Sequence, residues 1–377
     1  MFGTRIDLFT IFGFTIRLDT SWFLLAFLIA WSLATNVFPT QVEGLDSQVY
    51  WVMGVVGALA LFASIVAHEL GHALVARRFG LEMKGITLFI FGGVAEMNEE
   101  PPSAKAEFWV AIAGPIVSLV IGLGSLVIYS LGTNLTLSAA GLAVIGYNGL
   151  VNLVLVGFNL LPAFPLDGGR VLRSILWNTW GSLRRATRVT SSIGSFFGLG
   201  FIVLGAFTLF QGNFIGGMWW FLIGLFLRNA ARGSYQQLLL RRTLEGSPVS
   251  RFMKTDIITV PRAVSVHTLV EDYIYRHHHK LYPVMDEDSL IGCVTTHDVK
   301  ALPRDEWPRQ SVGAITHPCG VDNTIGPDED AMAALARMQQ NQASRLMVID
   351  SEGRLIGILT LKDLLNFFSE KMELEPA

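Results

Sequence analysis

The apolar residues of this chain gather in six long runs that are separated by short polar stretches. A helix that spans a membrane needs about 20 predominantly apolar residues, and each run is close to that length. The pattern therefore predicts a multi-pass protein with about six transmembrane helices in a lipid bilayer. The runs lie near residues 21–38, 51–77, 108–131, 139–161, 191–211 and 214–232.

Positive charges fall on alternate sides of these runs. Lys and Arg precede the first run and occur between the second and third, after the fourth and at the end of the sixth. Residues 39–50, 132–138 and 211–214 contain neither. Cytoplasmic loops are enriched in Lys and Arg. The distribution therefore predicts a protein of the cell membrane whose N- and C-termini are both cytoplasmic.

The composition agrees with a membrane protein. Of the 377 residues, 51% are hydrophobic and 16% are charged, and the mean hydropathy is +0.46. Ordinary soluble domains do not combine these values. The formal net charge of -3 is close to neutral, so we expect no nucleic-acid partner held by a basic surface.

Two apolar segments are too short to span a membrane as helices and are typical of β-hairpins. Residues 5–19 would turn near Phe12 and Gly13, and residues 85–97 would turn at Gly92-Gly93. We expect these hairpins to form a small sheet at the membrane boundary. An exposed sheet edge can bind an extended peptide through main-chain hydrogen bonds, so the second hairpin is the predicted place for a substrate strand.

The composition becomes a mixture of polar and apolar residues from about residue 245. Residues 281–299 and 345–364 match almost position for position, and each predicts two strands, a final Thr-x-x-Asp and a helix. The fold class is therefore a polytopic α-helical membrane protein followed by a soluble α+β tandem module. The expected boundaries are 1–235 for the transmembrane domain, 236–248 for a linker, and 249–305 and 306–377 for the two repeats.

The sequence HELGH places His68, Glu69 and His72 inside the second apolar run. Histidines at positions i and i+4 project from one face of a helix and can bind one metal ion. A chance match is disfavoured because three unpaired polar groups in hydrocarbon would be costly. The pattern predicts one zinc ion per chain, with Glu69 beside the metal as the acceptor of a proton from zinc-activated water.

A catalytic zinc takes three protein ligands and keeps an open position. Asp167 is the candidate for the third ligand, because it follows the fourth run on the side where the second run ends. Pro162 and Pro165 break the helix there. The alternative is that Asp167 only caps the following helix, with Gly168 and Gly169 making the turn.

Two motifs together, HELGH and NLLPAFPLDGG, resemble the site-2 protease family of intramembrane zinc metalloproteases. The resemblance covers most of residues 1–235. It implies that His68, His72 and Asp167 bind zinc and that Glu69 is the catalytic acid/base. It also implies a transmembrane protein substrate that is cut within or near its span, as in regulated intramembrane proteolysis.

Asn159 shares a helical face with Asn152, and Asn148 lies one turn further along. Such a polar stripe often only joins helices through hydrogen bonds. The alternative is that Asn159 donates a hydrogen bond to the scissile carbonyl or its oxyanion. We expect the catalytic role for Asn159 and the structural role for the other two asparagines.

The C-terminal repeat resembles a pair of CBS domains over residues 249–368. The resemblance implies that an adenine nucleotide (ATP, ADP or AMP) binds the pair and modulates proteolysis, and we expect a homodimer through the pair. Thr-x-x-Asp is also a helix N-cap pattern, so the pair could serve only to dimerise. The run of histidines at 277–279 is expected on a solvated surface. The expected nucleotide-binding residues are Thr295, Asp298, Thr360 and Asp363.

Two other classes of function fit part of this pattern. A metal transporter tends to place ligands on corresponding helices of repeated halves, whereas HELGH occurs once in this chain. A catalytically silent scaffold of the same fold would be expected to lack Glu69 or a metal ligand, and the chain keeps them all. The sequence therefore favours an intramembrane zinc endopeptidase.

Overall fold

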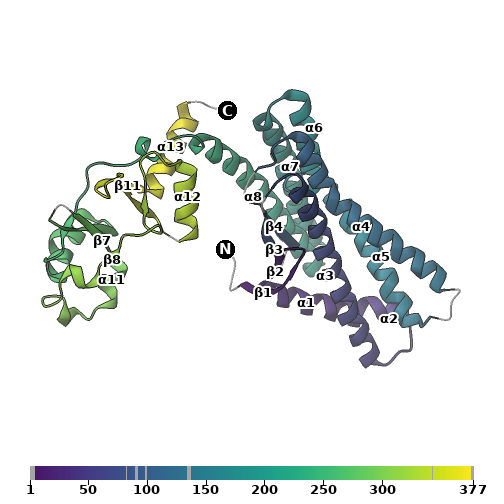
Figure 1. Ribbon diagram of the computed structural model, residues 1–377. Helices are drawn as coiled ribbons and strands as arrows, with labels where there is room; N and C mark the ends of the chain where they lie inside the picture. The colour runs from purple at the N-terminus through teal and green to yellow at the C-terminus, as the bar shows by residue number, and fades with distance from the viewer. Residues whose placement is uncertain are drawn as a thin grey trace. The chain divides into compact units, whose positions relative to one another are not determined.

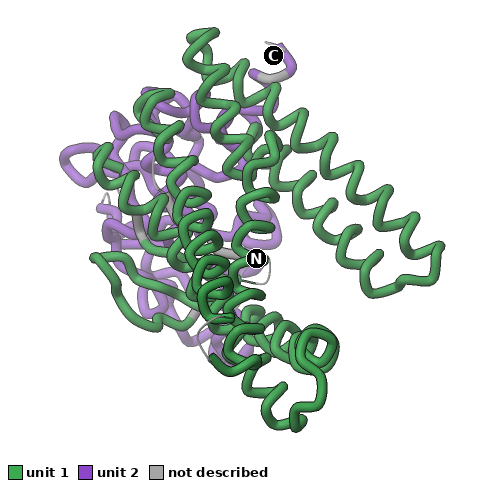
Figure 2. Tube along the Cα trace, turned by 90° about the vertical axis from the view of Figure 1, so that its right-hand side faces the viewer, with its two compact units in different colours: residues 1–236 green, residues 237–377 purple. Residues whose placement is uncertain are grey.

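A computed structural model describes residues 5–81, 83–89, 92–97, 100–133, 137–287, 289–341 and 343–374. The chain divides into two compact units, residues 1–236 and 237–377 (Figure 2). The first unit is mainly helical, and the second is built of short strands and helices (Figure 1). The predicted order, a polytopic helical domain and then an α+β module, is confirmed.

Within the described residues, six helices are long and apolar enough to cross a membrane, as the hydrophobic pattern predicts. The short helix α6 (Asp167–Trp180) lies between the fourth and fifth of them. The last one ends at Leu244, so most of the expected linker 236–248 is helical. The six spans are α1–α2 (Ser21–Gln41, including a π-helical stretch at Leu33–Val37), α3 (Ser47–Arg78), α4 (Ala104–Gly132), α5 (Ala139–Asn159), α7 (Leu183–Phe210) and α8 (Phe214–Leu244).

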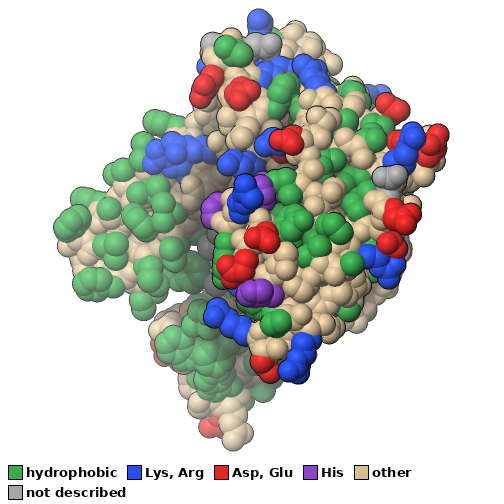
Figure 3. Space-filling view, turned by 90° about the vertical axis from the view of Figure 1, so that its left-hand side faces the viewer, with side chains coloured by type: hydrophobic (Ala, Val, Ile, Leu, Met, Phe, Trp, Pro, Cys, Tyr) green, Lys and Arg blue, Asp and Glu red, His purple; other side chains and the backbone are tan. Residues whose placement is uncertain are grey.

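The outward faces of these helices are apolar. Val120 and Val127 on α4, and Phe196, Val203 and Phe207 on α7, are all exposed. Figure 3 shows hydrophobic side chains covering the visible faces of the helices, whereas charged side chains of both signs are scattered over the second unit. Soluble monomers rarely expose such extended apolar surface. These faces are therefore the surface that lipid covers.

Polar side chains inside the helical unit pair with one another. Asn152 of α5 is fully buried, and its Nδ2 donates to Ser64 Oγ on α3 at 3.0 Å. Asn148 Nδ2 donates to Ser125 Oγ on α4 at 3.1 Å. These bonds join three helices where water is excluded. The structural role predicted for Asn148 and Asn152 is therefore confirmed.

A four-stranded sheet accompanies the helices of the first unit. Its strand order is β1-β2-β3-β4, so β4 lies at an edge. Ile16, Leu18, Ile86 and Leu88 form a buried cluster on this sheet, against which Ile65 of α3 packs. The strands are β1 (Arg5–Ile11), β2 (Phe14–Asp19), β3 (Met83–Phe89) and β4 (Gly92–Met97).

The two hairpins of this sheet compare differently with the sequence prediction. Phe12 and Gly13 both have positive φ, 51° and 87°, as the predicted two-residue turn requires. Gly92 and Gly93, expected in the second turn, instead pair with Phe89 and Leu88 as the first residues of β4. Glycine is tolerated in a strand where another backbone approaches closely. The two glycines are therefore strand residues, and the prediction that they form the turn is wrong.

The second unit contains two similar sheets, of order β5-β6-β7-β8 and β11-β10-β9. Each has a central antiparallel pair and a short parallel strand, and each buries its own apolar cluster. The internal repeat is therefore a structural repeat. Its main elements are β5 (Val260–Pro261), β6 (Leu281–Asp286), β7 (Ser289–Thr295), α11 (Thr296–Ala301), β8 (His317–Pro318), β9 (Thr324–Ile325), α12 (Ala331–Gln340), β10 (Arg345–Ile349), β11 (Leu355–Thr360) and α13 (Leu361–Leu374).

Candidate functional site

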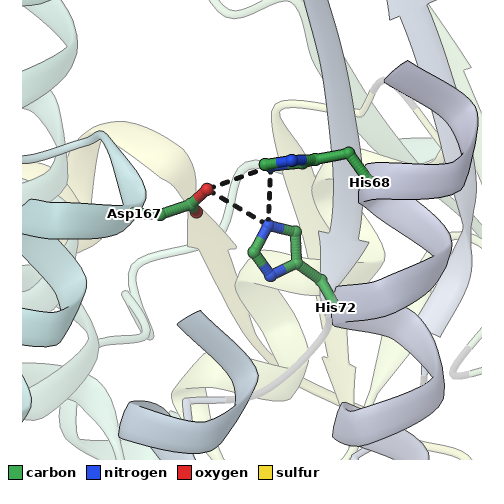
Figure 4. Close-up of side chains that lie close together, drawn as sticks. All are labelled: His68, His72 and Asp167. Carbon is green, nitrogen blue, oxygen red and sulfur yellow. Dashed lines mark hydrogen bonds and ion pairs between the residues drawn. The ribbon is translucent and has the colours of Figure 1, made fainter. Parts of the chain in front are cut away.

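The two histidines of HELGH and Asp167 meet at one buried point between α3 and the start of α6 (Figure 4). The Nε2 atoms of His68 and His72 lie 3.1 Å apart. Asp167 Oδ2 lies 3.0 Å from His68 Nε2 and 3.3 Å from His72 Nε2. Ligand atoms at about 2.0–2.1 Å from a tetrahedral zinc are about 3.3 Å from one another. The three atoms therefore have the spacing of three corners of a zinc coordination tetrahedron.

Hydrogen bonds on the far side of each ring set the chemistry of this cluster. His72 Nδ1 lies 2.6 Å from the backbone carbonyl of Val110, which only accepts, so Nδ1 donates and the neutral ring keeps a lone pair on Nε2. His68 Nδ1 lies 2.9 Å from Ser118 Oγ. Lone pairs that face a carboxylate at these distances repel unless a cation lies between them. The donor set of two imidazole nitrogens and one carboxylate oxygen fits zinc.

Asp167 is the first residue of α6, and the N-cap position before it is Leu166. The carboxylate faces the histidines, so the alternative that Asp167 only caps the helix is not what the structure shows. Gly168 and Gly169 lie inside α6. A β-carbon at Gly168 would come within 2.2 Å of the Leu160 carbonyl oxygen, and one at Gly169 within 2.3 Å of a backbone nitrogen. The glycines therefore let α6 start tightly against the preceding turn.

Helix α4 supplies a second set of residues that the sequence analysis missed. Val110 and Ser118 bond the two histidines, and Gly114 lies between them on the same helical face. A β-carbon at Gly114 would lie 2.2 Å from His72 Nε2 and 2.6 Å from His68 Nε2. The spacing of four residues was visible in the sequence, but nothing in it connected this face to α3.

Glu69 and Asn159 have free side chains. Glu69 follows the first histidine on α3, and Asn159 is the last residue of α5, before the turn that leads to Asp167. Both are partly buried. Among the described residues, neither side chain has a hydrogen bond or an ion pair. Both groups are therefore available to a bound molecule.

The two Thr-x-x-Asp motifs of the second unit both form capping boxes. Thr295 caps α11, and its backbone N–H and hydroxyl donate to Asp298 Oδ2 at 2.7 and 2.6 Å. Thr360 and Asp363 make the same contacts at the start of α13. Burial favours the neutral form of Asp298, but hydrogen bonds from Thr295 and His317 outweigh it and lower the pKa of Asp298 below its usual value. Both motifs thus have the predicted N-cap geometry.

A cavity of about 660 Å³ adjoins one of the two motifs, that of Thr360 and Asp363. Thr295 and Asp298 are not among its lining residues. The histidines at 278 and 279 are exposed, as expected, and they lie on the cavity wall together with cations that the sequence analysis did not single out. The basic residues of the wall are Lys254, His278, His279, Lys280, Arg345 and Lys362.

Comparisons with known proteins agree with this geometry. The family model described as peptidase family M50 matches residues 56–140 and 136–205, and the CBS domain model matches residues 249–304 and 315–370. A candidate zinc metalloprotease of Synechocystis sp. is 34% identical over 361 residues, which cover 95% of this chain and 93% of the relative.

A second relative resembles the chain over nearly its whole length, and a solved structure resembles it over a smaller part. Rip3 of Mycobacterium tuberculosis, also named a candidate zinc metalloprotease, is 35% identical over 362 residues, covering 95% of this chain and 91% of Rip3. The structure of the site-2 protease from Methanocaldococcus jannaschii is 31% identical and covers 62% of this chain and 95% of that chain, with a TM-score of 0.44. The family models and the two relatives show that the chain is a multi-pass zinc metalloprotease that belongs to peptidase family M50, the site-2 proteases, and carries a pair of CBS domains.

Proposed function

We propose that the chain hydrolyses peptide bonds within or near transmembrane segments of membrane proteins, with zinc held by His68, His72 and Asp167. The observation that carries the proposal is the convergence of three buried ligand atoms, two from α3, which is long enough to span a membrane, and one from the start of the short helix α6. A protease site within the membrane-spanning part of the chain could cut peptide bonds that the bilayer hides from soluble proteases. The expected substrate is a single-span membrane protein whose cleavage releases a cytosolic fragment.

Bound zinc would supply a Lewis acid that lowers the pKa of water and polarises the scissile carbonyl. Glu69, whose carboxylate has no hydrogen-bond or ion-pair partner among the described residues, would accept the proton of the attacking water and pass it to the leaving amine. Asn159 would donate a hydrogen bond to the carbonyl oxygen as negative charge develops on it.

The substrate segment must be extended, because the peptide bonds of a helix are shielded by their own hydrogen bonds. Strand β4 lies at the edge of the sheet, and within the described part of the chain it pairs with β3 alone. An edge strand offers N–H and C=O groups to an added strand and is tolerant of its side chains. We therefore assign substrate alignment to β4.

The membrane orientation follows from charge. The stretches rich in Lys and Arg, including both ends of the transmembrane domain, would face the cytoplasm of the cell. The CBS pair, which follows the last span, would then also be cytoplasmic. In this position it can bind a cytosolic nucleotide.

The cavity beside Asp363 is our candidate for the nucleotide site. Asp363 and Thr360 would bond the ribose and phosphate, and the cations on the wall suit a polyphosphate. Lys254 Nζ lies 3.0 Å from Asp363 Oδ1, and its exposed side chain is free to turn toward a phosphate. The regulation of proteolysis by this nucleotide is part of the proposal.

The equivalent place in the first repeat differs in two residues. Arg345 lies opposite Thr360 across β10 and β11, whereas Leu281 lies opposite Thr295. His317 Nε2 lies 2.8 Å from Asp298 Oδ1, at the place that Lys254 takes beside Asp363. The first repeat therefore offers fewer permanent cations, and we assign one nucleotide to each chain.

Metal analysis tests the ligand assignment. We expect about one zinc per chain in purified wild-type protein, because three ligands and an open position make a catalytic site. Elemental mass spectrometry should show this zinc lost from His68→Ala and Asp167→Ala and kept in Glu69→Gln. Gly114→Ala should also lose it, because the methyl group would occupy the space between the histidines.

Gly124→Ala is the matched control for the glycine substitution. It lies on the same helix, and a β-carbon there would meet nothing within 4 Å. It should keep the zinc. Zinc retained in Gly114→Ala, or lost equally from both alanine variants, would contradict the geometry.

Kinetics on single-span reporter proteins in proteoliposomes test the catalytic roles. Glu69→Gln should abolish cleavage at full zinc content. Asn159→Ala should lower kcat by roughly 10²–10³ with little change in KM, the effect of removing one oxyanion donor. Asn152→Ala, which removes the hydrogen bonds to Ser64 and Asn148, is the control and should keep kcat. An unchanged kcat in Asn159→Ala would end its catalytic assignment.

Proline scanning across Gly92–Met97 tests the role of β4. Alternate residues of an edge strand direct their N–H groups outward. Proline at an outward position removes a donor for the substrate and leaves the ladder with β3 intact. We expect such variants to lose cleavage of the reporters at normal zinc content. Parallel loss of cleavage and zinc at every position would indicate misfolding instead.

Calorimetry on the full-length protein in detergent tests the nucleotide site. We expect ADP or ATP to bind at one site per chain, with AMP weaker because it presents fewer charges to the cations. Arg345→Met should weaken binding by about 10-fold or more, the value of a hydrogen bond to a charged group. Arg354→Met, whose guanidinium pairs with Asp350, is the control. No heat with any of the three nucleotides would refute the assignment.

The CBS pair is also our candidate for a homodimer contact. Light scattering on the same samples would then give twice the 41.4 kDa mass of one chain. A monomeric mass with and without nucleotide would exclude the dimer.

A further inference from the structure

A buried ion pair joins α4 to α6 beside the candidate metal centre. Glu107 of α4 is 0% exposed and Arg173 of α6 is 6% exposed. Arg173 Nε donates to Glu107 Oε1 at 2.6 Å, and Arg173 Nη2 contacts the same oxygen. Burying two charges is costly, and a buried pair is weak evidence for stability. Its presence therefore calls for another explanation.

The pair lies on the two helices that complete the metal centre around α3. On α4, Glu107 comes one turn before Val110, whose carbonyl holds the ring of His72. On α6, Arg173 lies on the helix that begins with Asp167. At 1.5 Å per residue these separations are about 4.5 Å and about 9 Å along the helix axes. The ion pair thus links the helix that orients the histidines to the helix that carries the carboxylate.

Arg173 also holds the turn that leads into α6. Its guanidinium lies over the ring of Phe164, 4.8 Å from the centroid. The backbone of Phe164 is in turn packed against Gly169 and Gly194, where a β-carbon would come within 2.3 Å and 1.9 Å of it. A planar guanidinium can stack on a ring and bond a carboxylate at the same time, which the ammonium of lysine cannot do.

Glu107 is held through one oxygen. Oε1 receives both contacts from Arg173, while Oε2 is buried and has no hydrogen-bond partner among the described residues. An incompletely bonded carboxylate in a dry interior costs stability. The arrangement therefore indicates that the ion pair fixes the relative position of α4 and α6 rather than adding to the stability of the fold.

We propose that Glu107 and Arg173 are positioning residues that fix α6 against α4 and so hold Asp167 within ligand distance of His68 and His72. The inference rests on the proposed metal site. Neither residue touches the metal or the substrate. Their effect is on the spacing of the ligand atoms, which decides how tightly and in what geometry a metal ion binds.

The double variant Glu107→Met/Arg173→Met tests this proposal. Apolar residues of similar volume commonly replace a buried ion pair with no loss of stability. The fold should therefore survive, but the directional link between the helices is gone. We expect its affinity for Co²⁺, measured by competition with a chelator, to fall by about 10–100-fold, as for other residues that orient ligands. The visible absorption of bound Co²⁺ should also change.

Two single variants complete the experiment. Arg173→Lys keeps the positive charge but loses the planar guanidinium, so it should show an intermediate loss of Co²⁺ affinity. If the double variant does not fold, this variant alone tests the positioning role. Asn148→Ala, which breaks the part-buried hydrogen bonds to Ser125 and Ser64, is the control for destabilisation and should keep the wild-type affinity and spectrum.

The outcomes separate this proposal from the proposed function. Wild-type Co²⁺ affinity and spectrum in the folded double variant, or in Arg173→Lys where the double variant does not fold, would reduce the ion pair to a packing contact and overturn the proposal. A wild-type protein that binds no Co²⁺ or zinc would instead overturn the metal site itself.

Discussion

Hydrocarbon neither hydrogen-bonds nor screens charge, so each polar group within the spans must find its partner in the protein. The helical unit meets most of this constraint in layers, although Glu107 Oε2 and Asn152 Oδ1 have no hydrogen-bond partner among the described residues. Serine and asparagine side chains bond across α3, α4 and α5, and the two histidines direct their outer nitrogens to α4. What remains at the centre is two imidazole nitrogens and one carboxylate oxygen, a donor set that fits zinc. The candidate metal site is thus continuous with the hydrogen bonds that satisfy the buried polar groups around it.

The sequence predicted that these three residues would meet because their pattern is local. His68 and His72 share a face by helical spacing alone, and Asp167 follows a proline-broken helix end on the same predicted side. Val110, Gly114 and Ser118 were not predicted. Their importance depends on which face of α4 meets α3, and hydrophobic periodicity does not choose between faces when lipid and protein are both apolar. The same holds for the pairing of Glu107 with Arg173.

In the CBS pair, the sequence predicted the fold of both repeats but not the different surroundings of their two motifs. The two Thr-x-x-Asp motifs look equivalent in the sequence and form equivalent capping boxes, yet a cavity with a cationic wall adjoins Thr360 and Asp363. The difference comes from Lys254, Arg345 and the histidines at 278 and 279, which lie outside the motif and reach the cavity from several segments. A repeat predicts that two folds are alike, but the chemistry of each depends on residues that the repeat does not share.

The close approach of α4 to the metal centre also bears on how such chains are classified. The resemblance of this chain to its family was seen in HELGH and the motif that holds Asp167, whereas the space beside the two histidines depends on a position with no side chain, Gly114. A paralogue that kept both motifs and gained a methyl group there would satisfy a motif search and be counted as a protease. A search for inactive proteins of this fold should therefore check the glycine position on α4 as well as the loss of metal ligands.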